Sequence, residues 1–280
     1  MQNKLTVFYD HILNAAKQRG ITTAEIAAEI TACGITGVEM DYYMLKESGD
    51  GLAEELARLG LPIYDCYCFF DWANHPDDQS YIQVIDDLKR LGINHLLVVP
   101  GFIGRDIVSS GNQDIITTAL ARAREAMLPN MIHLLDYASE QGIDVAMEDF
   151  DDMSAPFATM EQVKWFLDRL PALGCAFDTG NFLYSEQDVL SAYELLNDRI
   201  TYVHCKDRSF TPVEGEEIHY TVNGRAMYSA AVGNGVIPMS AILKSLSEKN
   251  YTGPIAIEHF GSMDQLSDMK TSASFLKYFS

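Results

Sequence analysis

The chain has 280 residues, of which 48% are hydrophobic, and its formal net charge is -20 at pH 7. This length is a little above the roughly 250 residues of a typical (β/α)8 barrel. The hydrophobic content is sufficient for a large core, so an intrinsically disordered chain is not expected. The acidic balance argues against nucleic acids and anionic membranes as partners, because both favour a basic surface.

Targeting and membrane signals are also absent from the sequence. Residues 1–20 contain no long apolar run of the kind found in a signal peptide, and no apolar stretch reaches the length of about 18 residues expected of a membrane span. The five cysteines are odd in number, and their spacing does not suggest a disulfide framework. We therefore expect a reduced, cytoplasmic protein.

Short apolar segments of strand length alternate along the chain with longer segments of helical periodicity. The expected strands are residues 5–10, 37–41, 62–70, 94–101, 144–150, 175–182, 200–207 and 254–261. Apolar residues recur at three- and four-residue steps in the segments 22–33, 80–91, 159–170 and 188–199, as in amphipathic helices. The region 113–142 contains Pro129, which predicts either two helices or one kinked helix.

The joints between predicted helices and strands resemble one another. Glycine or asparagine, which tolerate the left-handed backbone that ends many helices, stands at Gly34, Gly60, Gly92, Gly142, Gly174, Asn197 and Gly253. Apolar strands linked by helices indicate a parallel sheet that is covered on both faces. Eight such units favour a closed barrel, and no GxGxxG motif follows the first strand, as a dinucleotide fold would require. We predict one (β/α)8-barrel (TIM-barrel) domain over residues 1–280.

Each of the last four predicted strands ends with a residue type that binds metal ions. These residues are Glu148 in AMEDF, Asp178 in AFDTGNF, His204 in YVHCKD and Glu258 in AIEHF. Taken singly, each has an ordinary structural explanation: a salt-bridged carboxylate, a helix N-cap or a core histidine. However, active sites of such barrels lie at the C-terminal strand ends, and unpaired buried carboxylates are costly. Four residues that can bind metal, placed at the same depth in the barrel, therefore indicate a shared divalent cation.

Three carboxylates and one imidazole form a hard, mostly oxygen-donating ligand set. Such a set favours Mn²⁺, Mg²⁺ or Co²⁺, although Zn²⁺ is also compatible with it. Four protein ligands leave about two positions of an octahedral shell open. These positions suit the carbonyl and a neighbouring hydroxyl of a small sugar.

At these motifs the sequence resembles the xylose isomerase-like barrel superfamily of sugar and sugar-phosphate isomerases and epimerases, including the ketose 3-epimerases. The resemblance covers most of the chain and includes GVEM around Glu39 and the segment VGNGVIP at 232–238. It implies that Glu148, Asp178, His204 and Glu258 are the metal ligands. One departure is Asn181, because many relatives carry histidine there. Apurinic endonucleases, which are distant members, have further histidines on strands that here end in Tyr67, Cys68, Pro100 and Asn181, so DNA repair is disfavoured.

The resemblance implies an epimerase that acts beside the carbonyl of a ketose or ketose derivative through an enediolate. Glu148 and Glu258 would be the acid–base pair, and the partner would be a small-molecule sugar or sugar phosphate. Two alternatives use the same metal site: an aldose–ketose isomerase and a dehydratase of keto-polyols such as inososes. A third is a metal-dependent sugar-binding protein without turnover. Relatives are often dimers or tetramers, so we expect a homodimer or homotetramer.

Several other residues are candidates for substrate binding. Lys206, two residues after His204, either holds a substrate oxygen or phosphate or forms a salt bridge with Glu258 or Asp178. Arg208 lies on a long segment, 208–237, that we expect to be a lid; it either contacts substrate or is a solvated loop charge. Asn181 is a further candidate. Trp72 is expected either to stack on a sugar or to close a subunit interface, and Glu39 either reaches the floor of the site or forms a structural ion pair.

Overall fold

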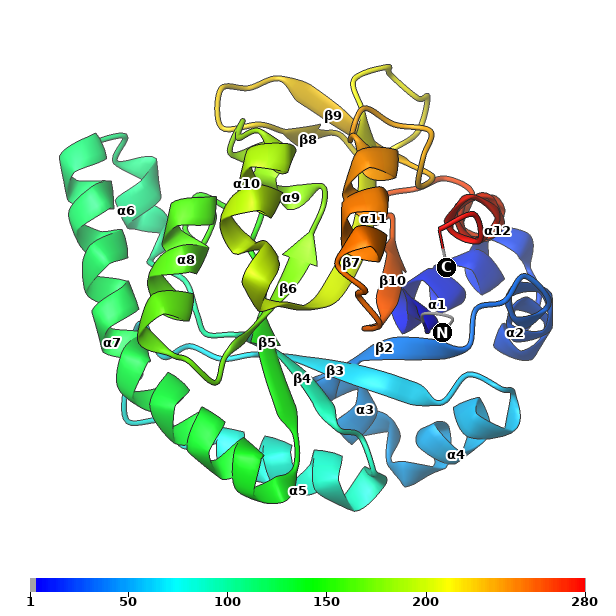
Figure 1. The fold of residues 1–280 in the computed structure, drawn as a ribbon, viewed down its shortest axis with the longest axis horizontal. Coiled ribbons are helices and arrows are strands. Elements are labelled where there is room, and N and C mark those ends of the chain that lie inside the picture. Colours follow the sequence, from blue (N-terminus) through cyan, green and yellow to red (C-terminus); the bar gives the residue numbers. More distant parts are fainter. Residues whose placement is uncertain (1–3, 280) are drawn as a thin grey trace.

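Parallel strands that are each followed by helices make up most of the computed structural model, which describes residues 4–279 (Figure 1). The barrel strands are β1 (Leu5–Phe8), β2 (Gly37–Asp41), β3 (Ile63–Phe69), β4 (His95–Val99), β5 (Asp144–Met147), β6 (Gly174–Asp178), β7 (Ile200–Ser209) and β10 (Ile255–Glu258). They correspond one to one with the eight strands predicted from the sequence.

The sheet closes on itself, because β10 pairs in parallel with both β1 and β7. All the intervening neighbours from β1 to β7 are also parallel. The fold is therefore a (β/α)8 barrel, as predicted. The register sets Asp178 on β6 beside His204 on β7, and Lys206 on β7 beside Glu258 on β10. Polar residues from consecutive strands consequently meet at one end of the barrel.

Helices surround the strands in Figure 1. They are α1 (Tyr9–Arg19), α2 (Thr23–Ala32), α3 (Tyr42–Ser48), α4 (Asp50–Arg58), α5 (Tyr81–Leu91), α6 (Arg105–Ser109), α7 (Gln113–Gln141), α8 (Met160–Arg169), α9 (Asn181–Tyr184), α10 (Val189–Leu196), α11 (Met239–Glu248), α12 (Gln265–Leu276) and the 3₁₀ turn η1 (Asn197–Arg199). α7 is one helix of 29 residues that contains Pro129, which settles the choice left open by the sequence. No helix among residues 4–279 combines the length and apolarity that a membrane span requires.

Local sequence signals explain where many helices begin and end. Thr22 and Thr159 each form a reciprocal capping box at the start of α2 and α8. The predicted left-handed glycines are present at Gly34, Gly60, Gly92 and Gly142. Three joints differ from the prediction. Gly174 is the first residue of β6, Asn197 has a right-handed backbone, and Asn250 (φ 56°) rather than Gly253 takes the left-handed conformation after α11.

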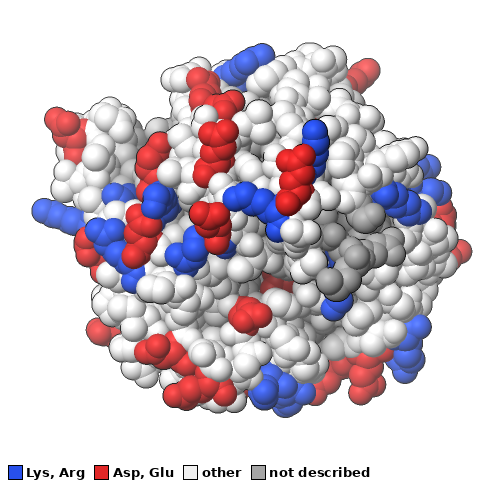
Figure 2. Space-filling model, in the orientation of Figure 1, with Lys and Arg blue, Asp and Glu red and all other residues white. Residues whose placement is uncertain are grey.

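Apolar side chains form two clusters that match the layers of the barrel. The larger cluster joins the outward faces of the strands to the helices, for example through Val7, Ile12 and Val38. A smaller cluster inside the barrel consists of Phe8, Leu97, Ala176, Tyr202 and Ala256. All five cysteines are free. On the face drawn in Figure 2, acidic and basic side chains are interspersed.

The segment after the seventh barrel strand is more ordered than the predicted lid. β7 continues to Ser209, and its last residues pair antiparallel with β9 (Ala226–Ala230). β9 pairs in turn with the short strand β8 (His219–Tyr220). Figure 1 shows this β8–β9 hairpin in gold, next to the barrel strands. Residues 208 and 209 thus belong to a strand rather than to the loop expected over 208–237, which corrects the start of that loop.

Asp207, near the end of β7, anchors the segment that leads into α11. Its carboxylate accepts hydrogen bonds from the backbone N–H groups of Gly233, Gly235 and Ile237, at 2.9 to 3.2 Å, and from that of Arg208 at 2.9 Å. A Cβ atom on Gly235 would lie 2.0 Å from Asp207 Oδ1 and 2.3 Å from the carbonyl oxygen of Arg208. Only glycine fits this position.

Gly235→Ala should therefore lower the free energy of unfolding by about 3 kcal/mol, because backbone must move and hydrogen bonds to Asp207 are lost. Chemical denaturation of both proteins measures the difference. Gly51→Ala is the matched control, since Gly51 lies in α4 with nothing within 4 Å of its added Cβ. The control should be neutral or slightly stabilising. Equal stability of the Gly235→Ala protein and the parent would contradict the expected clash.

Candidate metal centre

Four side chains from neighbouring strands converge at the C-terminal end of the barrel. Glu148 directly follows β5, Asp178 ends β6, His204 lies within β7 and Glu258 ends β10. Each offers one ligand atom, and these atoms all lie within 4.8 Å of one another. All four residues are buried, with exposed fractions of 8% or less. The residues predicted from the strand ends thus form one cluster.

His204 lies between carboxylates on both sides of its ring. Nδ1 is 2.9 Å from Glu148 Oε2 and 3.4 Å from Glu258 Oε2, so it faces the cluster. Nε2 is 3.1 Å from Glu39 Oε2, on the far side of the ring. Burial alone would lower the pKa of His204, but Glu39 and Glu148 outweigh it and raise this pKa well above its ordinary value. Glu39 is thus a buried partner of His204, consistent with the structural ion pair considered from the sequence.

The two oxygens of Asp178 have different surroundings. Oδ1 accepts backbone hydrogen bonds from Gly180 (2.6 Å) and Asn181 (2.7 Å), which fix the turn after β6. Oδ2 is buried and has no hydrogen-bond partner within residues 4–279. Burial raises the pKa of this carboxyl well above its ordinary value. A buried carboxylate oxygen without a hydrogen-bond partner, on a residue clustered with three other potential ligands, is what a divalent cation would satisfy.

Lys206 forms the salt bridge that was one of its two predicted roles. Its Nζ lies 2.7 Å from Glu258 Oε1 and donates a 2.7 Å hydrogen bond to Asn181 Oδ1. The Asn181 amide in turn donates to the carbonyl oxygen of Asp149 at 2.9 Å. Asn181 is therefore tied to its neighbours in the position where many relatives carry histidine. Contact of either residue with substrate stays a prediction.

Glu148 and Glu258 have similar burial but opposite electrostatic environments. Burial raises the pKa of Glu148 above its ordinary value, and His204 offsets this only in part. Burial acts on Glu258 in the same direction, but Lys206 and His204 outweigh it and lower the pKa of this carboxyl. Two carboxylates with divergent proton affinities at one site are typical of acid–base pairs.

A cavity of about 330 Å³ opens above the cluster, and Glu148 and Glu258 form part of its wall. One side of this cavity is aromatic and apolar, whereas the other is polar. The apolar side consists of Phe8, Tyr67, Phe69, Leu97, Val99, Phe150 and Phe260. The polar side consists of Asp151, Asn181, Lys206, Arg208 and His219, whereas Asp41 ends β2, between the strands that bear Phe8 and Tyr67. This mixture of apolar walls and a few polar groups is usual for small-molecule sites.

Arg208 is a wall residue of this cavity rather than a solvated loop charge. Only 2% of it is exposed, and its Nη2 lies 3.1 Å from Asp151 Oδ2. Its position follows from the alternation of side chains along β7, which places His204, Lys206 and Arg208 on one face. Arg225, by contrast, is exposed and lies over the ring of Phe210.

Trp72 does not have either of the roles expected from the sequence. It has no exposed surface, its ring stacks on Phe70 at 4.2 Å between centroids, and its backbone N–H donates to the carbonyl oxygen of Pro100. A side chain enclosed in this way cannot stack on a sugar or reach a subunit interface. Trp72 is a core residue, and the prediction of a binding role is wrong.

Sequence reasoning missed some residues of the site. Asp151 and His219 line the cavity, but they lie in segments after β5 and β7 whose paths have no sequence periodicity. Asp65, in the middle of β3, is buried, and its position among apolar neighbours was a usable signal. Burial, together with the nearby carboxylate of Glu39, raises its pKa well above the ordinary value.

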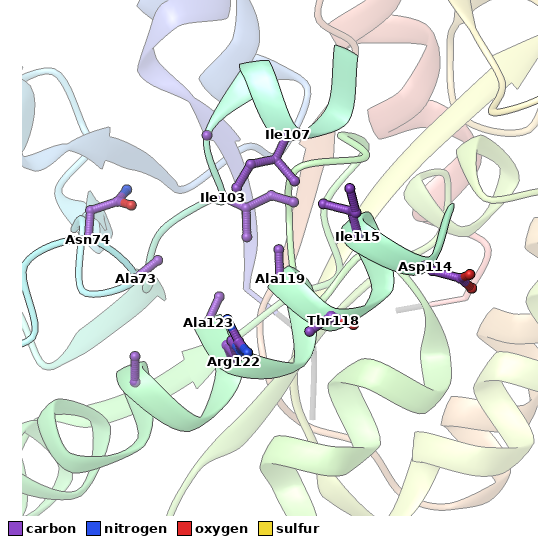
Figure 3. A pocket seen from close by; sticks show the side chains of 12 residues that line it. Ala73, Asn74, Ile103, Ile107, Asp114, Ile115, Thr118, Ala119, Arg122 and Ala123 are labelled. Atoms are coloured by element: carbon purple, nitrogen blue, oxygen red, sulfur yellow. The ribbon is translucent and has the colours of Figure 1, made fainter. Parts of the chain in front are cut away.

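A second and larger cavity, of about 630 Å³, lies outside the barrel (Figure 3). Residues from the loop after β3, from α6 and from the first half of α7 line it, and Ile103, Ile107 and Ile115 supply much of its apolar surface. Its charged lining residues are Asp114 and Arg122, and it shares no lining residue with the strand-end cavity. Of these two cavities, the strand-end cavity is the one lined by members of the four-residue cluster, Glu148 and Glu258.

The barrel and its strand-end cluster define a class of (β/α)8 proteins with a candidate metal site. Residues 27–279 match the model of the family described as xylose isomerase-like TIM barrel, so the chain belongs to that family.

Individual relatives match either a short part of the sequence or the fold at low sequence identity. An inosose dehydratase from Clostridium botulinum is 33% identical over 85 residues, and this match spans 29% of the chain and only 28% of the relative. The D-allulose 3-epimerase from Methylomonas sp. superposes with a TM-score of 0.68 at 16% identity, covering 100% of this chain and 98% of that one. A xylose isomerase-like protein from Mycobacterium smegmatis in complex with magnesium gives a TM-score of 0.62 at 16% identity, covering 91% and 87%. These two structures establish likeness of fold.

Proposed function

We propose that the chain is a divalent-metal-dependent sugar isomerase or epimerase. It would act next to the carbonyl of a ketose or ketose derivative through an enediolate. The observation that carries this proposal is the convergence of three carboxylates and one imidazole, within 4.8 Å, on a cavity of about 330 Å³. The activities for which the epimerase and dehydratase relatives are named agree with such chemistry on sugar carbonyl compounds.

The residues present fit a single divalent cation. Asp178 Oδ2 needs a partner, His204 directs Nδ1 at the cluster, and Glu148 and Glu258 each contribute a carboxylate. Mn²⁺, Mg²⁺ and Co²⁺ suit this oxygen-rich set, and Zn²⁺ remains compatible. When bound, the cation would polarise the substrate carbonyl and acidify the neighbouring C–H bond.

Glu148 and Glu258 are the proposed acid–base pair. One carboxylate removes the proton from the carbon beside the carbonyl, and the other returns a proton to the opposite face. Lys206 orients Glu258 through its 2.7 Å contact with Oε1. The aromatic side of the cavity, which includes Phe8 and Phe260, would pack against the apolar C–H face of a sugar.

A dehydratase of keto-polyols is the second candidate, and a specific observation favours it. The curated relatives that match a part of this sequence are inosose dehydratases, at up to 33% identity. The same pair of carboxylates would remove a proton and protonate a leaving hydroxyl. Aldose–ketose isomerisation and sugar binding without turnover are further alternatives. A homodimer or homotetramer and a cytoplasmic location stay predictions.

Deuterium exchange followed by NMR tests the proposal. The protein, stripped of metal and resupplied with Mn²⁺, Mg²⁺ or Co²⁺, is incubated in D₂O with ketoses, ketose phosphates and inososes. Deuterium beside the carbonyl of a substrate, accompanied by a new epimer, is the expected result. An aldose or a dehydrated product would shift the function to one of the alternatives. Metal binding without exchange in any compound would contradict catalysis of this class.

Glu39 should support the metal through His204, because a carboxylate behind a ligating histidine fixes the orientation of its ring. Glu39 Oε1 accepts hydrogen bonds from Tyr202 and, at 3.3 Å, from Thr6, which leaves Oε2 facing His204. Glu39→Gln should weaken metal binding by about 10- to 100-fold. Competition with a fluorescent chelator measures this affinity.

Thr6→Val is the matched control, since it removes one hydrogen bond to Glu39 but leaves the carboxylate in place. This variant should retain metal affinity within a few-fold of the parent. A Glu39→Gln protein with unchanged melting temperature and unchanged metal affinity would show that Glu39 does not act on His204.

A further inference from the structure

The polar side of the strand-end cavity contains two buried cations in addition to the candidate metal ligands. Lys206 and Arg208 project from β7 with exposed fractions of 5% and 2%. Asp151, from the segment after β5, lies between them, and His219 on β8 completes this side. A substrate held at the cluster would extend toward these residues, so their charge balance bears on what the substrate carries.

Both cations are already paired with carboxylates. Lys206 Nζ is 2.7 Å from Glu258 Oε1, 3.6 Å from Asp151 Oδ2 and 3.8 Å from Asp178 Oδ2. Arg208 Nη2 is 3.1 Å from the same Oδ2 atom of Asp151. Burial, together with the positive charge of Arg208, lowers the pKa of His219, so this imidazole adds a hydrogen-bonding group but no positive charge at neutral pH. Asp41 adds a further acidic residue to the lining.

Backbone N–H groups near the last barrel strands are also engaged in hydrogen bonds within the chain. Phosphate sites of (β/α)8 barrels are often formed by backbone near the last two strands. In this chain the N–H groups of Gly233, Gly235 and Ile237, which precede α11, donate to the Asp207 carboxylate. An internal carboxylate thus occupies the cluster of amides that would otherwise be available to an anion.

We propose that Asp151 is a specificity-determining residue that makes this site select an uncharged polyol and reject phosphorylated or carboxylated sugars. The inference rests on the proposed function, because it names the class of substrate for that site. Asp151 neutralises Arg208 and faces Lys206, so an anionic substituent would have to displace or approach a carboxylate. Like charges placed together at a binding site disfavour binding.

Asp151 and Arg208 together offer a suitable contact for neutral hydroxyl groups. Asp151 accepts a hydrogen bond and Arg208 donates one, and Arg208 Nε is buried without a hydrogen-bond partner in the described chain. His219 Nε2 is likewise buried without such a partner among residues 4–279. The Asp151 side chain is 23% exposed, so hydroxyls of a polyol can donate to it, while the C–H faces of the polyol pack on Phe69, Phe150 and Phe260.

Equilibrium binding to matched ligand pairs tests this inference without requiring turnover. The probes are D-fructose with D-fructose 6-phosphate, D-xylulose with D-xylulose 5-phosphate, and inorganic phosphate. Free metal is removed from the loaded protein by gel filtration before calorimetric titration, because phosphates chelate metal in solution. The parent protein should bind the neutral member of a pair at least about 10-fold more tightly than its phosphate.

Asp151→Asn should release Arg208, with little change in shape. We expect it to reduce the preference for neutral ligands by about 10-fold or to reverse it, with new binding of inorganic phosphate. Asp77 is exposed and remote in the sequence from Asp151. Asp77→Asn changes the net charge by the same amount and should leave the preference for neutral ligands unaltered. Arg208→Gln should weaken binding of the neutral probes without creating phosphate binding. Melting temperatures establish that each variant is folded.

Tighter binding of a phosphate than of its neutral partner by the parent protein would overturn the inference, as would an unchanged preference in Asp151→Asn. These outcomes are separate from the fate of the proposed function. Deuterium exchange confined to phosphorylated ketoses would support the proposed function and contradict the selectivity inferred for Asp151. Selective binding of neutral probes without any exchange would support the selectivity and contradict the proposed function.

Discussion

Glu148→Gln and Glu258→Gln should each reduce deuterium exchange into the substrate by about 10³-fold, within the range that general acid–base groups contribute. An amide cannot take up the proton that either carboxylate is proposed to transfer. Because glutamine can still offer an oxygen atom to a metal, exchange should be measured by NMR at saturating metal concentration. The bound metal is quantified in the same samples, so loss of the ion is distinguished from loss of the proton acceptor.

Glu248→Gln is the control for this pair of variants. Glu248 is exposed at the end of α11, where its contact with Lys244 is weak at 3.8 Å. Exchange should therefore proceed at the parental rate. If either cavity variant retained full exchange with metal bound, that glutamate would not be part of the acid–base pair.

Asp178→Asn should weaken metal binding by at least about 100-fold, since it removes an anionic ligand from a buried site. Asn retains an oxygen to accept the N–H groups of Gly180 and Asn181, so the turn after β6 should persist. The parent protein should gain about 2.7 kcal/mol of stability at a metal concentration 100 times Kd. The variant should show almost none of this gain at the same concentration, as measured by thermal denaturation with and without metal.

Asp188→Asn provides a matched comparison for the metal experiment. Asp188 also accepts a backbone hydrogen bond at the start of a helix, from Ser191 at 2.8 Å, but it is exposed and far from the cluster. Its replacement should leave the stabilisation by metal intact. Equal stabilisation of the Asp178→Asn protein and the parent would exclude Asp178 from the ligand set.

The sequence was sufficient to predict the barrel because its signals are local and repeated. Apolar runs fixed the eight strands, and most joints had the expected glycine conformation. The positions of Glu148, Asp178, His204 and Glu258 followed from the same reasoning, since the ends of parallel strands must meet. Alternation along β7 correctly predicted the face on which Lys206 lies. Its close salt bridge with Glu258, however, depends on the distance between strands, which the sequence does not give.

Features that depend on contacts between distant segments were harder to predict. Trp72 is buried because its backbone bonds to Pro100 and its ring stacks on Phe70, which no sequence periodicity records. Arg208 lies on the cavity face of β7 because this strand continues to Ser209, where it pairs with β9. Asp151 lines the cavity because of the path of the segment after β5. In each case the residue type was known from the sequence, but the residues that surround it in the fold could not be predicted.

The alternation along β7 has a consequence for how this protein can vary during evolution. His204, Lys206 and Arg208 share one face, whereas Asp207 faces the segment before α11. An insertion or deletion of one residue within the strand would exchange the two sets and disrupt the candidate ligand, its counter-ion and the anchor together. Changes of length in the turn between β8 and β9 leave the pairing of β7 with β9 in place. Divergence in substrate range should therefore accumulate in the hairpin, while β7 keeps a constant length.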